Sequence, residues 1–255
     1  MIQKNLIGIY SFPKSGNTWV RHIISALFSS TPELCCPNIY EEGLPTRYIQ
    51  LPRADANSSQ SKRFAFYKSH GFQPIYLHDG VRLQHRAFIY VIRHPLDVFM
   101  SYLNYELSVV GGKFFELKYK SVDEVIAAND LDLFFSTFCV LGTVRPSFMD
   151  AGSWMLHVKY WILTRQAIPV ILLRYEELVS DPIKALNELC GFLAVGEKQL
   201  IEALSIANKA TQIDGAFFWR RNNGGYRDFL TKDQIARFYR LHGEIAQAAG
   251  YPLTE

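Results

Sequence analysis

The stretch YSFPKSGNTWVRHII, which starts at residue 10, constrains the fold of this chain more than any other segment. An apolar run, LIGIYS, leads into it, and apolar residues at helical spacing follow it from Trp19 onward. A strand, a glycine-containing loop and a helix in this order build the phosphate-binding loop of nucleotide-binding α/β proteins. The sequence therefore predicts an anion site at the start of that helix.

The residues of this loop differ from those of a nucleoside triphosphatase. The triphosphatase pattern, GxxxxGK[ST], places a lysine beside the β- and γ-phosphates and a hydroxyl on magnesium. Here Thr18 keeps the hydroxyl, but Asn17 replaces the lysine, and the lysine has moved to Lys14. Backbone N–H groups at the helix start can still bind a 5′-phosphate, while Lys14 can reach the bridging oxygen beyond it. We expect phosphate binding, without magnesium-dependent triphosphate hydrolysis, from the loop residues Ser15, Gly16, Asn17 and Thr18.

Four short runs rich in β-branched and aromatic residues predict buried strands. They are LIGIYS from residue 6, FAFYK from residue 64, AFIYVI from residue 87 and VILLRY from residue 170. Three of them are followed closely by helix signals, such as Pro95 at a first helical turn and Asp181 with Pro182 at a helix start. This alternation predicts a three-layer α/β/α fold with a mostly parallel central sheet. At 255 residues, we expect a single domain over residues 1–255.

Polar residues follow the predicted strands at their carboxyl ends. The groups after the second, third and fourth strands are Lys68, Ser69 and His70, then Arg93 and His94, then Tyr175, Glu176 and Glu177. Ligands of open α/β sheets bind at this edge of the sheet. We therefore expect these side chains, which are far apart in the sequence, to converge on one edge of the sheet, together with the phosphate-binding loop.

Composition and cysteine spacing exclude several classes of protein. The formal net charge is +3, and no run of lysine and arginine occurs, which disfavours a nucleic-acid binder. The four cysteines, Cys35, Cys36, Cys139 and Cys190, have neither CxxC spacing nor a disulfide-dense pattern, which predicts reduced thiols. No stretch approaches the ~20 apolar residues of a membrane span, and the N-terminus leads into a strand without a signal peptide. These features predict a cytoplasmic location.

Five motifs, in the same order, resemble those of the cytosolic sulfotransferases that use 3′-phosphoadenosine 5′-phosphosulfate (PAPS). PKSGNTW resembles the family's PKSGTTW loop, and KSH at residue 68 stands where the family has KTH. RHPLDVFMSYLNY resembles RNPxDxxxSYxxF and keeps Arg93 and Ser101 eight residues apart. GSWMLHVKYWI resembles GSWxxHVxxW, and RYEELVSDP resembles YEDLxxDP. The resemblance covers residues 6 to about 195; farther on, WRRNNGGYRDFLT matches the family's RKGxxGDWK only with a gap and lacks the Asp-Trp.

The resemblance implies PAPS as the sulfuryl donor and a set of residues that bind it. It implies that Arg93 and Ser101 hold the 3′-phosphate. Either Arg220 or Arg221 would join them, and the choice between these two neighbours stays open. The adenine region falls to three further residues, Trp19, Tyr175 and Ser205.

Sulfuryl transfer needs a base for the acceptor and stabilisation of negative charge on the departing phosphate. His70, with an unperturbed pKa near ~6.5, can take a proton from an acceptor hydroxyl at neutral pH. Lys14 can neutralise the bridging oxygen, and the resemblance adds Lys68 and Ser101 to the catalytic set. We expect no metal, because the sequence has no cluster of histidine, cysteine or carboxylate ligands.

Two other functions stay open at this point. A P-loop kinase of a small molecule would use ATP with magnesium, and a non-catalytic nucleotide-binding module would keep its function without His70. The acceptor of a sulfotransferase stays equally open, since a phenol, a lipid or natural-product alcohol and a glycan all carry a hydroxyl. The oligomeric state is unknown.

Aromatic side chains are numerous and have two interpretations, the wall of an apolar acceptor pocket or the core. The candidates are Tyr102, Tyr105, Phe114, Phe115, Phe134, Phe135 and Phe148. Another set, Trp154, His157 and Trp161, shares one helical face at i, i+3 and i+7, which predicts core packing.

Overall fold

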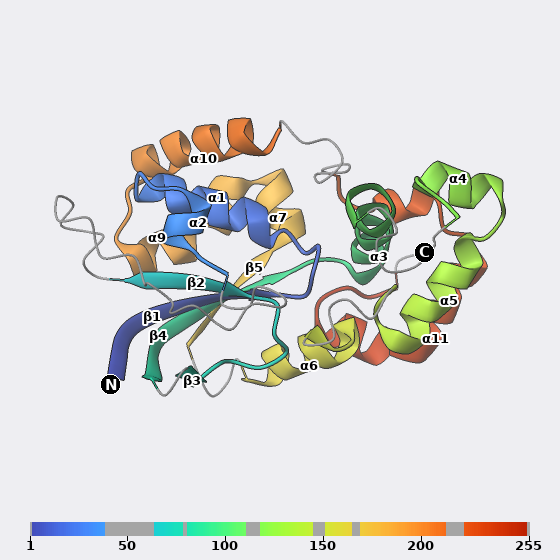
Figure 1. The fold of residues 1–255 in the computed structure, drawn as a ribbon, viewed down its shortest axis with the longest axis horizontal. Coiled ribbons are helices and arrows are strands. Elements are labelled where there is room, and N and C mark those ends of the chain that lie inside the picture. The colour runs from blue at the N-terminus through green and yellow to red at the C-terminus, as the bar shows by residue number, and fades with distance from the viewer. Residues whose placement is uncertain are drawn as a thin grey trace.

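A parallel sheet lies at the centre of the computed structural model, which describes residues 2–38, 64–78, 81–110, 118–144, 151–164, 169–212 and 222–253 (Figure 1). Its strands, in the order in which they pair, are β2 (Ala65–Ser69), β1 (Ile2–Ser11), β4 (Val81–Ile92) and β5 (Val170–Arg174). All four predicted strands are therefore confirmed. The sequence did not predict the first half of β4, nor the short strand β3 (Leu77–His78) that pairs antiparallel with it.

The side chains of β1 alternate between two cores, as the period of a strand requires. Ile7 and Ile9 belong to one buried cluster, and Leu6 and Tyr10 belong to the other. Because both faces of the sheet are apolar, helices cover both of them (Figure 1). The expected arrangement of helices on either side of a mostly parallel sheet is confirmed.

The first face is covered by helices from the N-terminal part and from the segment after β5. They are α1 (Asn17–Leu27), α2 (Pro32–Cys35), α7 (Tyr175–Ser180), α8 (Pro182–Ala185), α9 (Asn187–Leu193) and α10 (Glu197–Thr211). The side chain of Asp181 accepts a hydrogen bond from the backbone N of Lys184 at 3.1 Å, so the predicted helix start is confirmed. One continuous helix to Gly191 is wrong, because α8 ends at Ala185 and α9 begins anew after Leu186.

The remaining helices lie against the second face of the sheet or past the carboxyl ends of the strands (Figure 1). They are α3 (Pro95–Tyr105) with a π-helical turn (Glu106–Val110), α4 (Val122–Ala127), α5 (Leu131–Leu141), α6 (Trp154–Thr164), a 3-10 turn (Gly225–Asp228) and α11 (Lys232–Ala248). On α6, Trp154 and His157 are fully buried and Trp161 is 1% exposed, which confirms core packing for that trio. Among the described residues, no helix is both long and apolar enough to cross a membrane.

Several of the aromatic candidates are buried, and Phe135 belongs to this second core. Tyr102 and Phe135 are fully buried, and the Phe135 ring packs edge-on against Phe99 at 5.1 Å. Phe134 is partly buried against the same cluster. Phe114, Phe115 and Phe148 lie outside the described residues. The four cysteines are buried, and none of them is bridged in this structure.

Candidate functional site

The loop between β1 and α1 bends through left-handed backbone conformations. Lys14 has φ 67° and Gly16 has φ 102°. A Cβ at Gly16 would lie 2.5 Å from Cδ2 of Tyr175, so glycine is required by the backbone and also by this close approach. The turn is closed by the Ser15 backbone N, which donates to the Phe12 carbonyl at 3.3 Å. The first residues of α1 thereby present their backbone N–H groups toward the carboxyl edge of the sheet.

Two polar side chains of the loop are buried and have atoms that meet no partner among the described residues. Ser15 is 1% exposed and Asn17 is 3% exposed. The Asn17 amide donates backwards to the Ile9 carbonyl at 3.4 Å, while its Oδ1 and the Ser15 Oγ lack a hydrogen-bond partner. Buried polar atoms without partners are unfavourable unless a ligand or water satisfies them. They fit an anionic, hydrogen-bonding ligand at this loop.

Arg93 follows β4 and is buried beside the loop, 5% exposed. Its guanidinium lies over the Tyr175 ring, 4.2 Å from the ring centroid, and its Nη1 donates to the Lys14 carbonyl at 3.4 Å. The Nε atom has no partner within the described part of the chain. Ser101, 6% exposed, lies on α3 about two turns after Arg93. The structure thus joins the loop, Arg93 and Tyr175, as the strand-end argument predicted.

The Lys14 side chain lies against the end of α3. Its Nζ is 4.3 Å from the centroid of the Tyr105 ring, within the range of a cation–π interaction. Tyr105 follows Ser101 by one helical turn, so the two residues lie on the same face of α3. The sequence analysis left Tyr105 open between the core and an acceptor pocket, and it did not predict the contact with Lys14.

His70, just past β2, is held by the end of β1. Its Nδ1 lies 2.9 Å from the Ser11 carbonyl oxygen and 3.3 Å from the Ser11 Oγ. A carbonyl oxygen can only accept, so Nδ1 carries the proton and Nε2 keeps the lone pair. Burial, with the nearby charge of Lys68, holds the pKa of His70 well below its ordinary value of 6.5. The imidazole is therefore neutral and oriented as a base at neutral pH.

Lys68 lies in β2, two residues before His70. Burial, aided by the charge of Arg21, lowers the pKa of Lys68 to about 8. The backbone N of Lys68 donates to the Pro37 carbonyl at 2.8 Å, which holds this edge of the sheet. Lys68 is near enough to depress the pKa of His70, so the structure brings these two predicted residues together.

The residues predicted for the adenine region differ in their burial and in their contacts. Trp19 is buried, its ring meets Tyr175 edge-on at 6.1 Å, and its Nε1 donates to the Asn208 Oδ1 at 3.0 Å. Ser205 is exposed on α10, one turn before Asn208. Trp19 and Tyr175 therefore line one site, and Asn208 is a contact of it that sequence reasoning missed. Arg220 and Arg221 lie outside the described residues.

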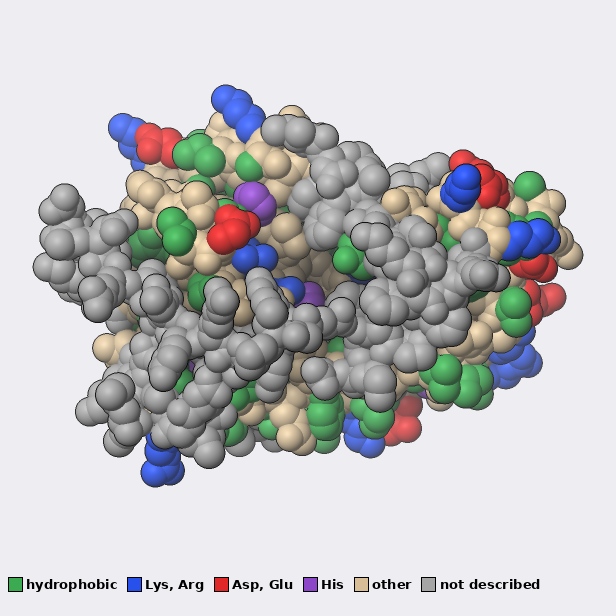
Figure 2. All heavy atoms as spheres, viewed as in Figure 1, with side chains coloured by type: hydrophobic (Ala, Val, Ile, Leu, Met, Phe, Trp, Pro, Cys, Tyr) green, Lys and Arg blue, Asp and Glu red, His purple; other side chains and the backbone are tan. Residues whose placement is uncertain are grey.

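Basic side chains and histidine gather in a hollow on one face of the molecule. Figure 2 shows them in the area between α1 and α3, above the carboxyl ends of the strands. The chemistry available there is anion binding by backbone N–H groups, lysine and arginine, next to a neutral imidazole. Within the described residues, no group of three or more histidine, cysteine or carboxylate side chains is placed to hold a metal ion.

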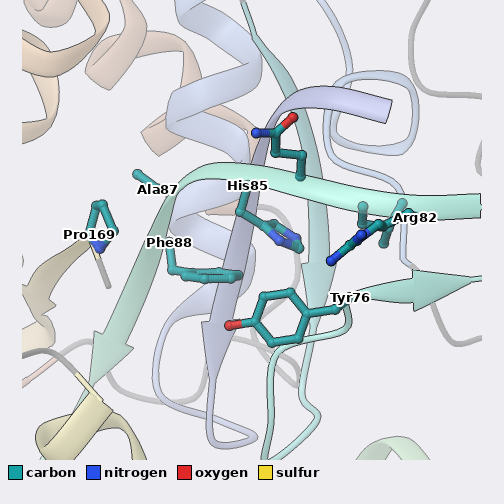
Figure 3. Close-up of a pocket in the computed structure, with 8 residues that line it drawn as sticks. Tyr76, Arg82, His85, Ala87, Phe88 and Pro169 are labelled. Atoms are coloured by element: carbon teal, nitrogen blue, oxygen red, sulfur yellow. The ribbon is translucent and has the colours of Figure 1, made fainter. Parts of the chain in front are cut away.

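A separate cavity of about 470 Å³ lies at the other end of the sheet, along the first half of β4. Figure 3 shows His85 and Phe88 pointing from β4 toward Tyr76. The His85 Nε2 is 2.7 Å from the Tyr67 hydroxyl, and burial lowers the pKa of His85 to about 4. None of the side chains that form the walls of this cavity belongs to the predicted site.

Comparison with known proteins assigns this combination of loop, strand ends and helices to a family. A model of the sulfotransferase domain matches residues 5–247. Sulfotransferase 2A1 of Homo sapiens is 27% identical over 187 residues, which cover 72% of this chain and 58% of that protein. The 3-beta-hydroxysteroid sulfotransferase of Cavia porcellus is 22% identical over 266 residues, 95% of this chain and 83% of that protein.

A solved structure shares the fold. Mouse sulfotransferase SULT7A1 complexed with PAP superposes with a TM-score of 0.61 at 17% identity, covering 98% of this chain and 90% of that chain. At this identity, the likeness establishes the fold alone. The match to the human relative spans little more than half of that protein, 58% of its length.

Proposed function

The chain belongs to the sulfotransferase family, and from that premise we propose that it transfers a sulfuryl group from PAPS to an acceptor hydroxyl, releasing adenosine 3′,5′-bisphosphate. The observation that carries the proposal is the convergence of Lys14, Arg93 and a neutral, oriented His70 on one loop. The relatives named sulfotransferases support it, as does a neighbour solved in complex with PAP.

The groups that bind the donor include buried polar atoms that have no hydrogen-bond partner among the described residues. The backbone of residues 15–18 holds the 5′-phosphate at the start of α1, where the helix dipole favours an anion. Arg93 and Ser101 hold the 3′-phosphate, with Arg220 or Arg221 as a further cation. Trp19 and Tyr175 contact the adenine, and Ser205 lies at the rim of that region. Ser15 Oγ, Asn17 Oδ1 and Arg93 Nε, buried without partners in the described part of the chain, fit this hydrogen-bonding ligand.

PAPS supplies the activated sulfuryl group, and the chain's own residues handle proton and charge. His70 Nε2 takes the proton of the acceptor hydroxyl as the new S–O bond forms. Lys14 neutralises the charge that develops on the bridging oxygen of the departing 5′-phosphate. Lys68 adds positive potential beside His70, which keeps the imidazole unprotonated until it receives the acceptor proton. Ser101 lies one helical turn before Tyr105, whose ring contacts this lysine.

We propose a small, largely apolar molecule as the acceptor. Relatives named for hydroxysteroids support this class, as does a neighbour solved with retinol and PAP. Phe72, two residues after His70, packs edge-on against Tyr160 of α6 at 5.1 Å, which gives an aromatic wall next to the base. Hydroxysteroids are therefore the first acceptors to test, followed by simple phenols and a glycan.

The test is a thermal shift with adenosine 3′,5′-bisphosphate, run beside ADP and beside ATP with magnesium. At a ligand concentration of ~100 Kd, specific binding adds roughly 2.7 kcal/mol to the free energy of unfolding, which is readily measured. We expect a shift with the bisphosphate that disappears in Arg93→Ala, followed by sulfuryl transfer from labelled PAPS. A shift with ATP and magnesium alone would overturn the proposal in favour of a kinase.

A further inference from the structure

We infer that Glu176 is a positioning residue for the 3′-phosphate site, because its carboxylate fixes the backbone next to Arg93 and ties that backbone to the C-terminal part of the chain. The inference rests on the proposed function. Glu176 is not expected to touch the nucleotide; it acts through the orientation of Arg93.

The sheet places two dipeptides side by side. β4 and β5 are parallel neighbours whose last paired residues are Ile92 and Arg174, so Arg93 and His94 lie next to Tyr175 and Glu176. Two reciprocal contacts then join the dipeptides. The Arg93 guanidinium lies over the Tyr175 ring at 4.2 Å, and the His94 backbone N donates to the Glu176 Oε1 at 2.7 Å. The peptide unit between Arg93 and His94 is thus fixed by the Glu176 carboxylate.

The same carboxylate also reaches the C-terminal part of the chain. The Tyr251 hydroxyl donates to the Glu176 Oε2 at 2.8 Å, and the Asn223 side chain donates to the Glu176 backbone carbonyl at 3.1 Å. Burial raises the pKa of Glu176, while the His94 and Tyr251 hydrogen bonds oppose that rise. Removing the carboxylate would leave the His94 N–H and the Tyr251 hydroxyl without this acceptor, so the local backbone would have to rearrange.

A second carboxylate supports the same unit from the other side. Asp97, 3% exposed, accepts from the Gly224 backbone N at 2.8 Å and from the Tyr226 backbone N at 3.0 Å. The His94 ring stacks on the Tyr226 ring at 4.6 Å with an interplanar angle of 10°. His94, the residue after Arg93, is therefore held by Glu176, by the Tyr226 ring, by the Tyr239 hydroxyl at 3.2 Å from its Nε2, and by α3. Of these, the Glu176 carboxylate accepts from the peptide N–H that joins His94 to Arg93, while the Val98 backbone N of α3 donates to the His94 carbonyl at 2.9 Å.

The experiment measures the affinity for adenosine 3′,5′-bisphosphate divided by that for adenosine 5′-monophosphate, which isolates the contribution of the 3′-phosphate. We expect Glu176→Ala to lower this ratio by about tenfold, with the affinity for the monophosphate unchanged, because a misplaced arginine loses a charge-assisted hydrogen bond. Glu176→Gln, whose amide keeps an acceptor for His94, should keep the ratio within about twofold. In Arg93→Ala, adding Glu176→Ala should lower the ratio no further.

Glu177→Ala is the matched control. It removes the same charge one residue away, but the Glu177 side chain is 62% exposed and lies 4.0 Å from Arg174. The ratio of the two affinities in Glu177→Ala should equal that of the unmodified protein. Tyr251→Phe removes one hydrogen bond from Glu176 and should lower the ratio about threefold. If Glu176→Ala does not fold, Tyr251→Phe tests the positioning role of Glu176 in its place.

The two possible failures are distinguishable. If the unmodified protein binds the two nucleotides equally well, the 3′-phosphate site itself is wrong, and the proposed function fails. If the unmodified protein prefers the bisphosphate but folded Glu176→Ala keeps the full ratio, the proposed function stands and the role of Glu176 is refuted. An unchanged ratio in Tyr251→Phe, with Glu176→Ala unfolded, likewise refutes it. Equal losses for both nucleotides in Glu176→Ala would show a general structural role and would also refute the positioning role.

Discussion

The ammonium of Lys14 lies over the ring of Tyr105, 4.3 Å from the ring centroid. The two residues come from different elements, the loop after β1 and the last residue of α3. The negative face of an aromatic ring attracts a cation, so Tyr105 restricts where the long lysine side chain can lie. The Arg93 hydrogen bond to the Lys14 carbonyl holds the backbone of the same residue. Both ends of Lys14 are therefore fixed by the unit formed by β4 and α3.

Tyr105→Leu should lower kcat at saturating PAPS by about fivefold, because losing a partly exposed cation–π contact removes about 1 kcal/mol of orientation. Tyr105→Phe keeps the ring and should stay within about twofold of the unmodified enzyme. Steady-state sulfuryl transfer measures both. Equal losses in the two variants would assign the effect to the hydroxyl and would contradict a role for the ring.

The acid limb of the pH–rate profile should lie below pH 6.5. Burial and the charge of Lys68 depress the pKa of His70 below 6.5, so the active neutral form persists at neutral pH and is lost as pH falls through the lowered pKa. His70→Gln should lower kcat by ~10²–10⁴ and remove this limb. Binding of adenosine 3′,5′-bisphosphate should survive the substitution. An acid midpoint at or above pH 6.5 would contradict the assignment.

The pH–rate profile should also decline on its alkaline side, near pH 8. The pKa of Lys68 is lowered to about 8, so its positive charge is lost as pH rises through that value. If this charge supports the reaction, kcat declines over the same range. Lys68→Arg keeps the charge to much higher pH and should move the limb away from pH 8. Persistence of the limb in Lys68→Arg would assign it to another group.

Gly16→Ala should destabilise the fold and weaken the bisphosphate shift. The residue has φ 102°, and an added Cβ would lie 2.5 Å from the Tyr175 ring, so we expect a loss of about 1–3 kcal/mol in urea unfolding. Gly191→Ala is the matched control. Gly191 lies in α9, and no atom beyond its own helix would come within 4 Å of its Cβ, so alanine should be neutral or stabilising by up to ~1 kcal/mol. Similar losses at both glycines would contradict this account.

The stability of the protein should fall between pH 6.5 and about 3 partly because of His157. Burial lowers the pKa of this residue to about 3, and its Nδ1 lies 2.9 Å from the Tyr90 hydroxyl. In the unfolded chain, the His157 side chain binds a proton as the pH falls through about 6.5, whereas in the folded chain it stays neutral at that pH. The stability present above pH 6.5 is therefore lost as pH falls, by at most about 1.4 kcal/mol per pH unit.

Urea unfolding from pH 7 to pH 5 checks this slope. His157→Gln removes the titrating group. It should reduce the slope of the free energy of unfolding against pH by an amount that corresponds to at most one bound proton. A slope that is unchanged in this variant would show that other groups produce the acid sensitivity.

The sequence predicted the parts of this site that are encoded locally. The four strands and the loop from Lys14 to Thr18 follow from periodicity and from the glycine at the helix start. The convergence of Arg93 and His70 on that loop followed from the rule that parallel strands end at one edge. A single domain and a cytoplasmic location remain predictions, as do the roles of Ser205, Arg220 and Arg221.

Sequence alone determined the α/β fold and the types of side chain at the strand ends, because spacing and backbone sterics act over a few residues. Only the tertiary structure decided which partners those side chains meet. Glu176 bonds to Tyr251, 75 residues away, and Asp97 bonds to Gly224, 127 residues away. The protonation state of His70 also required the folded chain. Burial and long-range hydrogen bonds arise from packing, which local patterns in a single sequence do not specify.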